Sequence, residues 1–143
     1  MSDISLDVAR TIIAEALGYA EAAGLAPLAV AVLDRGGHLK AFERADGSSN
    51  LRFEVAFGKA NGALGLGVGS RALMARAEQQ PAFVSALSGV FGGGLVPVPG
   101  GVLVRDIAGA LIGAVGVSGD TSDNDEAAAV AGIAAAGFVP ETG

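Results

Sequence analysis

The strands that the sequence predicts follow one another through short glycine-containing turns, and this connectivity limits the fold more than any other feature. The apolar run 28–33 ends at the Asp-Arg-Gly-Gly turn 34–37, and residues 38–44 return as a second strand. Turns this short join antiparallel neighbours, whereas parallel strands need a crossover of a dozen or more residues. We therefore expect an antiparallel sheet with helices packed against it.

Three further apolar segments follow a flexible glycine joint at 92–94 and are separated by turns rich in glycine. Pro97 has no backbone N–H to donate, so its strand is placed at a sheet edge or a bulge. The sequence therefore predicts about five strands in total. The three additional strands are expected over 95–98, 102–104 and 110–117.

Helical periodicity fills the remaining segments. Ser5 is suited to cap a first helix that ends at Gly24, and apolar residues recur along it at four-residue spacing. Middle helices are expected over 50–65, 70–80 (capped by Ser70) and 81–87, and the glycine-rich stretch 65–70 before the second of them is interpreted as a linker.

A last helix is expected after the Ser-Asp-Asn-Asp capping box at 122–125, and Gly137 should end it with Phe138 in apolar contact. The predicted α+β order is α-β-β-α-α-β-β-β-α. All 143 residues are expected to form a single domain.

Composition narrows the classes of partner. Charged residues make up only 17% of the chain, against about 25% in an ordinary domain, so we expect apolar surface to be covered in a homo-oligomer. The net charge of −6 argues against nucleic-acid binding. No apolar run approaches the ~18–20 residues that span a bilayer, so no membrane partner is expected.

Cysteine is absent, which excludes disulfides, thiolate metal sites and a cysteine nucleophile, and no metal site is predicted. The N-terminal residues lack the pattern of a signal peptide. Both features favour a cytoplasmic location.

His38 is the only histidine, and hence the only side chain with an ordinary pKa near neutrality. It has two interpretations: it could ligate haem iron or move a proton, or it could simply begin a strand beside a two-glycine turn. The residues alone favour the structural interpretation.

Arg44, Asp46 and Lys59 form a second set of candidates, because Arg44 ends a strand, Asp46 opens a turn and Lys59 lies near the apolar face of the next helix. The Lys59 amine could bind an anion or could extend along its stem to solvent. Asp125 and Glu126 suit the first turn of the last helix, and a catalytic acid at Glu126 is the minor alternative.

Several motifs, in order along nearly the whole chain, make this sequence resemble the GlcG/HbpS-like family. The family implies a profilin-like arrangement of an antiparallel sheet with flanking helices, assembled into higher oligomers. Its characterised members bind haem, and some are linked to haem degradation or redox sensing. The motifs are Val30-Ala31-Val32-Leu33-Asp34-x-Gly36-Gly37-His38-Leu39, Arg44-x-Asp46-Gly47, Lys59-Ala60, Pro99-Gly100-Gly101, Gly113-Ala114-Val115-Gly116-Val117-Ser118-Gly119 and Asp125-Glu126.

The resemblance also implies a site. His38 would be the iron ligand, Arg44 and Lys59 would meet the haem propionates, and a pocket would lie near Gly100 and Gly101. Asp46 completes the predicted ligand-binding set.

Two functions follow from these residues. The first is an oligomeric small-ligand-binding protein for haem or a related tetrapyrrole, acting in binding, sensing or degradation. The alternative is a metal-independent enzyme that acts on a small organic acid by proton transfer, with His38, Lys59 and Glu126 as candidate catalytic groups, of the kind encoded beside glycolate-type genes. A structural or regulatory partner of another protein is a third interpretation.

Overall fold

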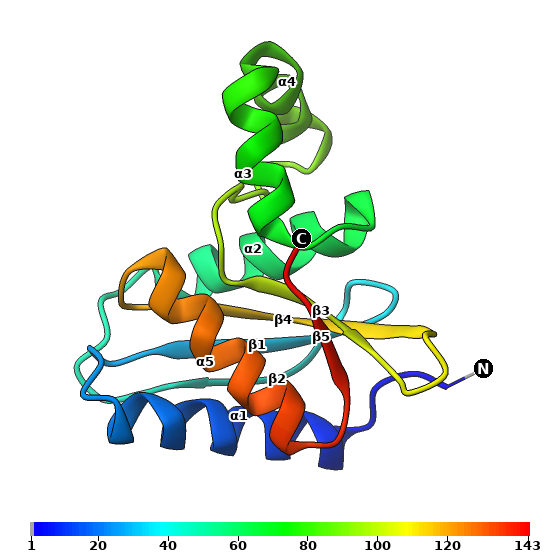
Figure 1. Cartoon of the computed structure of the whole chain (residues 1–143). Coiled ribbons are helices and arrows are strands. Elements are labelled where there is room, and N and C mark those ends of the chain that lie inside the picture. Colours follow the sequence, from blue (N-terminus) through cyan, green and yellow to red (C-terminus); the bar gives the residue numbers. More distant parts are fainter. Residues whose placement is uncertain (1) are drawn as a thin grey trace.

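A five-stranded antiparallel sheet forms the centre of the computed structural model, which describes residues 2–143 (Figure 1). The strands lie in the order β2-β1-β4-β3-β5, and each neighbouring pair is antiparallel. The predicted fold class is therefore confirmed. The strands are β1 (Ala29–Asp34), β2 (Leu39–Arg44), β3 (Gly101–Arg105), β4 (Leu111–Ser118) and β5 (Val139–Glu141).

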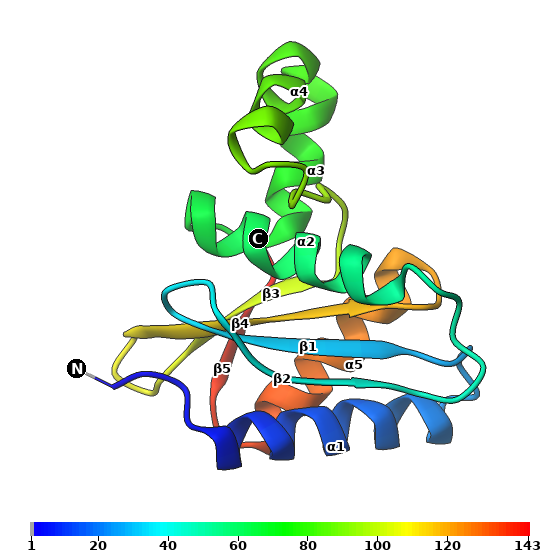
Figure 2. The same ribbon diagram turned by 180° about the vertical axis from the view of Figure 1, so that it is seen from behind.

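Helices cover both faces of this sheet. The helices α1 (Leu6–Ala22) and α5 (Ser122–Ala135) pack on one face, and α2 (Arg52–Leu66) lies across the other. Figure 2 shows that α3 (Ser70–Gln79) and α4 (Pro81–Val90) project from the α2 side as an arm. None of the helices in residues 2–143 is both long and apolar enough to cross a membrane.

The fifth strand is a different segment from the one predicted. Residues 95–98 form no strand, because the N–H of Val96 donates to the carbonyl of Gly58 on α2 and Leu95 packs against the arm. The missing N–H of Pro97 fits this placement outside the sheet. Instead, the segment after α5 turns back as β5 and pairs with β3.

The helix caps were predicted in part. Ser5 caps α1 by accepting a hydrogen bond from the N–H of Val8, as expected. The N-cap of α3 is Gly69 and not Ser70, whose hydroxyl accepts from the N–H of Gly101 across the structure. The predicted capping box at 122–125 is also wrong, because the N-cap of α5 is Thr121. In both cases the true N-cap is the residue before the predicted one, Gly69 or Thr121, and it has the extended backbone that a cap requires.

The core has one layer on each side of the sheet. The larger layer lies between the sheet and α1 and α5 and contains Ile12, Val32 and Ile133 at zero exposure. On the other face, α2 lies so close to β4 that a methyl group added at Gly116 would stand 1.8 Å from the carbonyl oxygen of Ala56. Glycine at this position therefore sets the distance between α2 and the sheet.

Candidate functional site

His38 lies at the tip of the β1–β2 hairpin, just before β2 begins, and its side chain is 82% exposed. Gly37 has a φ of +85°, a conformation that glycine adopts without strain. The turn is held by the Asp34 carboxylate, which accepts hydrogen bonds from the N–H groups of Gly36 and His38. The hairpin sequence therefore presents a single imidazole to solvent on an ordered turn.

The same carboxylate also orients the imidazole. The distance from Nδ1 of His38 to the Asp34 carboxylate is 3.3 Å, so Nδ1–H donates to Asp34 and Nε2 remains open. Burial acts to raise the pKa of Asp34, but the two backbone hydrogen bonds and the nearby imidazole outweigh it and hold that pKa below its ordinary value. An imidazole with one nitrogen held by a carboxylate can bind a metal through the other nitrogen.

Three half-buried phenylalanines lie on β2 and on the neighbouring helix α2. The ring of Phe42 meets that of Phe53 edge to face at 4.9 Å between centroids, and the rings of Phe53 and Phe57 are 5.8 Å apart. We call Phe42, Phe53 and Phe57 the aromatic cluster. Because β2 is an edge strand, this cluster lies at an open margin of the sheet, on the side that α2 covers.

Arg44 and Asp46 lie at the other end of β2, and both are exposed. Within residues 2–143 neither side chain has an ion-pair partner within 4.0 Å. The guanidinium of Arg44 is therefore available to an anionic group.

Lys59 occupies a very different environment, since only 2% of its side chain is exposed. Its amine donates to the carbonyl of Val117 at 2.9 Å and to the carboxylate of Asp125 at 3.0 Å. Burial lowers the pKa of Lys59 and raises that of Asp125, while the attraction between the two charges opposes both shifts. This buried pair joins α2, β4 and α5, so Asp125 does more than favour a helix dipole.

Gly100 and Gly101 lie directly against Lys59. A methyl group at Gly100 would stand 2.8 Å from the Lys59 amine, and one at Gly101 would stand 2.2 Å from the Lys59 carbonyl oxygen. The structure therefore brings together three of the predicted ligand-binding residues. The space that the missing side chains leave is filled by Lys59 itself.

Glu126 is held by a third set of contacts. Its two carboxylate oxygens accept hydrogen bonds from Arg71 at 3.0 and 3.1 Å, and Arg71 also pairs with Asp123. The hydrogen bonds that Arg71 donates, first to Glu126 and then to Asp123, raise the pKa of Arg71 above its ordinary value. Arg71 is not among the residues predicted from the sequence, because its partners lie 52 and 55 positions away.

His38 does not share a site with Lys59, another candidate catalytic group. His38 follows the turn that begins at Asp34, and Asp34 pairs with Gly113 of β4. Lys59 contacts Val117, which lies four residues further along β4. At about 3.3 Å per residue those two positions are roughly 13 Å apart. Glu126 and Lys59 are each engaged in a different ion pair.

A family model described as haem-degrading protein HbpS-like matches residues 4–134. The chain belongs to this family. The earlier resemblance, drawn from the motifs alone, is thereby confirmed. A search of curated proteins found no match.

Solved structures agree with membership of the HbpS-like family. The chain is similar to HbpS, with 30% identity and a TM-score of 0.81 over 94% of this chain and 90% of that one. It is similar to PduOC in a haem complex, with 25% identity and a TM-score of 0.82 over 93% and 94%. Protein ORFY of Klebsiella pneumoniae gives 25% identity and a TM-score of 0.85 over 95% and 92%.

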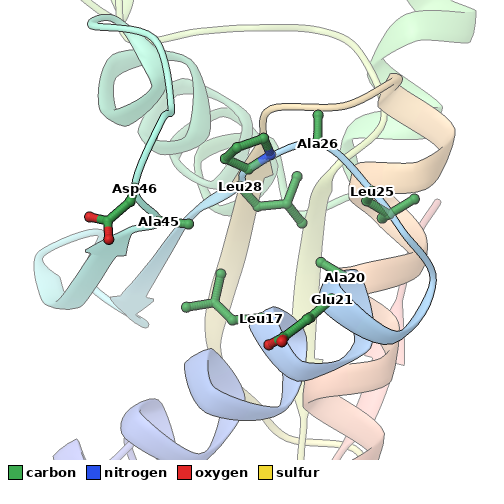
Figure 3. Close-up of a pocket in the computed structure, with 9 residues that line it drawn as sticks. Leu17, Ala20, Glu21, Leu25, Ala26, Leu28, Ala45 and Asp46 are labelled. Carbon is green, nitrogen blue, oxygen red and sulfur yellow. The ribbon is translucent and has the colours of Figure 1, made fainter.

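One hollow of this HbpS-like chain lies away from the predicted glycine pocket. It has a volume of about 370 Å³ and lies between the C-terminal end of α1, the segment 25–28 and the turn after β2 (Figure 3). Among the predicted ligand-binding residues only Asp46 lines it. Leu17 lines it from α1 and Leu28 from the segment before β1, a juxtaposition that sequence periodicity does not reveal.

Proposed function

We propose that this protein binds haem or a related tetrapyrrole through Nε2 of His38. The observation that carries the proposal is the exposed imidazole whose Nδ1 is held by Asp34. Membership of the HbpS-like family and the similarity to PduOC in a haem complex support it. When bound, the haem would supply an iron centre able to bind a further ligand or exchange an electron.

The chain offers suitable groups for the rest of such a ligand. Phe42 lies on β2 between His38 and Arg44, and the aromatic cluster presents apolar ring surface that a flat macrocycle would cover. Arg44 is exposed and level with Ser118, five residues or roughly 17 Å from the hairpin end, so it would meet a propionate only at the far edge of a macrocycle held by His38. A propionate contact from Lys59 would require its amine to leave Asp125, so we assign that contact to Arg44.

Titration of the purified protein with haemin tests the proposal. We expect a Soret band with a definite stoichiometry, and His38→Ala should weaken binding at least about ten-fold and move the band, because the iron loses its nitrogen ligand. Arg35→Ala is the matched control, since Arg35 is exposed in the same turn but has no metal-binding nitrogen. Unchanged affinity and band position in His38→Ala would reject His38 as the ligand.

Self-association belongs to the same proposal. No charged residue occurs between Gln80 and Arg105, and Val90 at the end of the arm is 82% exposed. Such a surface is commonly covered by a second copy. Sedimentation velocity should show an oligomer that Val90→Asp weakens, whereas Ile107→Asp, in a turn where Ile107 is 91% exposed, should have no effect. A stable wild-type monomer would contradict this self-association.

A cytoplasmic location stays a prediction from the sequence.

A further inference from the structure

The hollow beside α1 has the form of a small-molecule site. Its volume of about 370 Å³ lies within the range of about 300–1,000 Å³ typical of ligand pockets. Leu17, Leu25 and Leu28 provide apolar surface, and Glu21 and Asp46 stand at its margin. In Figure 3 the side chain of Leu17 lies between the two acidic residues.

Hydrogen bonds fix the walls of this hollow. The N–H of Ala45 donates to the carbonyl of Leu28 at 2.9 Å, which ties the turn after β2 to the start of β1. The N–H of Ala26 donates to the carboxylate of Asp120 at 2.8 Å. A ligand would therefore enter a preformed pocket and would not have to order a loop.

The electrostatics of the pocket favour positive charge. Glu21 lies in the last turn of α1, where the helix end carries partial negative charge and where no basic residue stands. Neither Glu21 nor Asp46 has an ion-pair partner within 4.0 Å among residues 2–143. A carboxylate near a helix C-terminus is unfavourable, because both carry negative charge. A bound cation would reduce this repulsion between Glu21 and the end of α1.

We propose that this pocket binds a small organic cation, in which an ammonium group is joined to a compact apolar body. The ammonium group would lie beside Glu21 or Asp46, which stand on either side of Leu17, and the apolar body would cover Leu17 and Leu25. Inside the pocket, which Arg44 does not line, the propionates of haem would be repelled by the same two carboxylates. The pocket is therefore a second site, independent of the one proposed at His38.

Binding of 2-phenylethylammonium, followed by two-dimensional ¹H–¹⁵N NMR, tests this inference. We expect the amide signals of Ala26, Leu28 and Ala45 to shift with added probe. Glu21→Gln and Asp46→Asn should each weaken binding about two- to five-fold, as expected for one exposed charge. Glu15→Gln is the matched control, because Glu15 is exposed on α1 but does not line the pocket.

A comparison of a cationic probe with an anionic one tests whether the pocket selects positive charge. The anionic probe 3-phenylpropionate should bind more weakly than 2-phenylethylammonium, and the Glu21→Gln/Asp46→Asn double variant should reduce that difference. Equal binding of the two probes, or no shift of the pocket amides, would overturn the inference. His38→Ala should leave amine binding unchanged, so failure of this site and failure of the haem proposal are separately visible.

Discussion

The two ends of the central strands each carry an acid–base pair, and the pairs differ in almost every physical respect. At the hairpin end, His38 and Asp34 are 3.3 Å apart with side chains 82% and 18% exposed. At the opposite end, Lys59 and Asp125 are 3.0 Å apart and each only 2% exposed. Solvent screens the first pair, whereas the second lies in the protein interior.

On the proposed haem role, this difference in exposure separates a ligand-binding pair from a structural one. The exposed pair contributes little to stability but leaves one imidazole nitrogen open to a ligand. The buried pair engages its groups fully, because the Lys59 amine also donates to Val117 and Asp125 also accepts from the N–H of Asp120. A family motif can therefore contain residues of both kinds, and exposure distinguishes them.

The largest expected effect is at the buried pair. Lys59→Met should destabilise the protein by about 3–5 kcal/mol, because it leaves the Asp125 carboxylate buried without its cation. Urea denaturation of both proteins would measure the loss. The double variant Lys59→Met/Asp125→Asn should recover much of it, since no charge then remains buried. A loss below about 1 kcal/mol in Lys59→Met would show that the two ends are energetically alike.

The next largest loss of stability is expected from substitution of a glycine beside the buried pair. Gly101→Ala should cost about 1–3 kcal/mol, because its methyl group would stand 2.2 Å from the Lys59 carbonyl and force α2 away from β3. Gly89→Ala in α4 is the matched control, because no atom lies within 4 Å of the added methyl. Thermal unfolding should show that Gly89→Ala is neutral or stabilising. Equal destabilisation by both substitutions would argue against tight packing at this end.

At the hairpin end, a substitution should affect ligand binding more than stability. Asp34→Asn keeps an oxygen that accepts from Gly36 and His38 but removes the charge that orients the imidazole. On the proposed haem role it should weaken haemin binding by about ten-fold, with little change in stability. Haemin titration and urea denaturation of the same samples would measure both. Loss of stability without loss of haemin affinity would reverse the roles assigned to the two pairs.

Local signals in the sequence predicted most of the fold. The glycine turn at 34–37 produced the hairpin, Ser5 capped α1, and Gly137 ends α5 with Phe138 against the core. In each case the interacting residues lie close together in the chain. Periodicity and turn chemistry are sufficient for such features.

Contacts between residues far apart in the chain could not be predicted from these local signals. Lys59 and Asp125 are 66 positions apart, so each was interpreted from its own helix. Ser70 has the residue type of a cap, but its hydroxyl instead accepts from Gly101, 31 positions away. The pocket beside α1 depends on how a helix end meets two strands. The binding roles of His38 and Arg44 stay predictions.

The smallest effect concerns Asp120, which adjoins the buried pair but is itself only half-buried. Its carboxylate accepts hydrogen bonds from the side chain of Asn124 and the N–H groups of Ala26 and Thr121, and these lower its pKa below 3.8. A group whose pKa is lower in the folded state stabilises the protein fully above its unfolded pKa and loses that contribution as the pH falls through the folded value.

Wild type should therefore lose stability below pH 3.8 more steeply than Asp120→Asn, whose side chain does not titrate. Urea midpoints measured across that range would show the difference, with Asp46→Asn as an exposed control that accepts no hydrogen bond from residues 2–143. Asp125 acts in the opposite sense, because burial raises its pKa and the folded protein then binds the proton more readily. Identical slopes in wild type and Asp120→Asn would mean that the hydrogen bonds at the margin of the buried pair add no stability, and that only the interior of this end is stabilising.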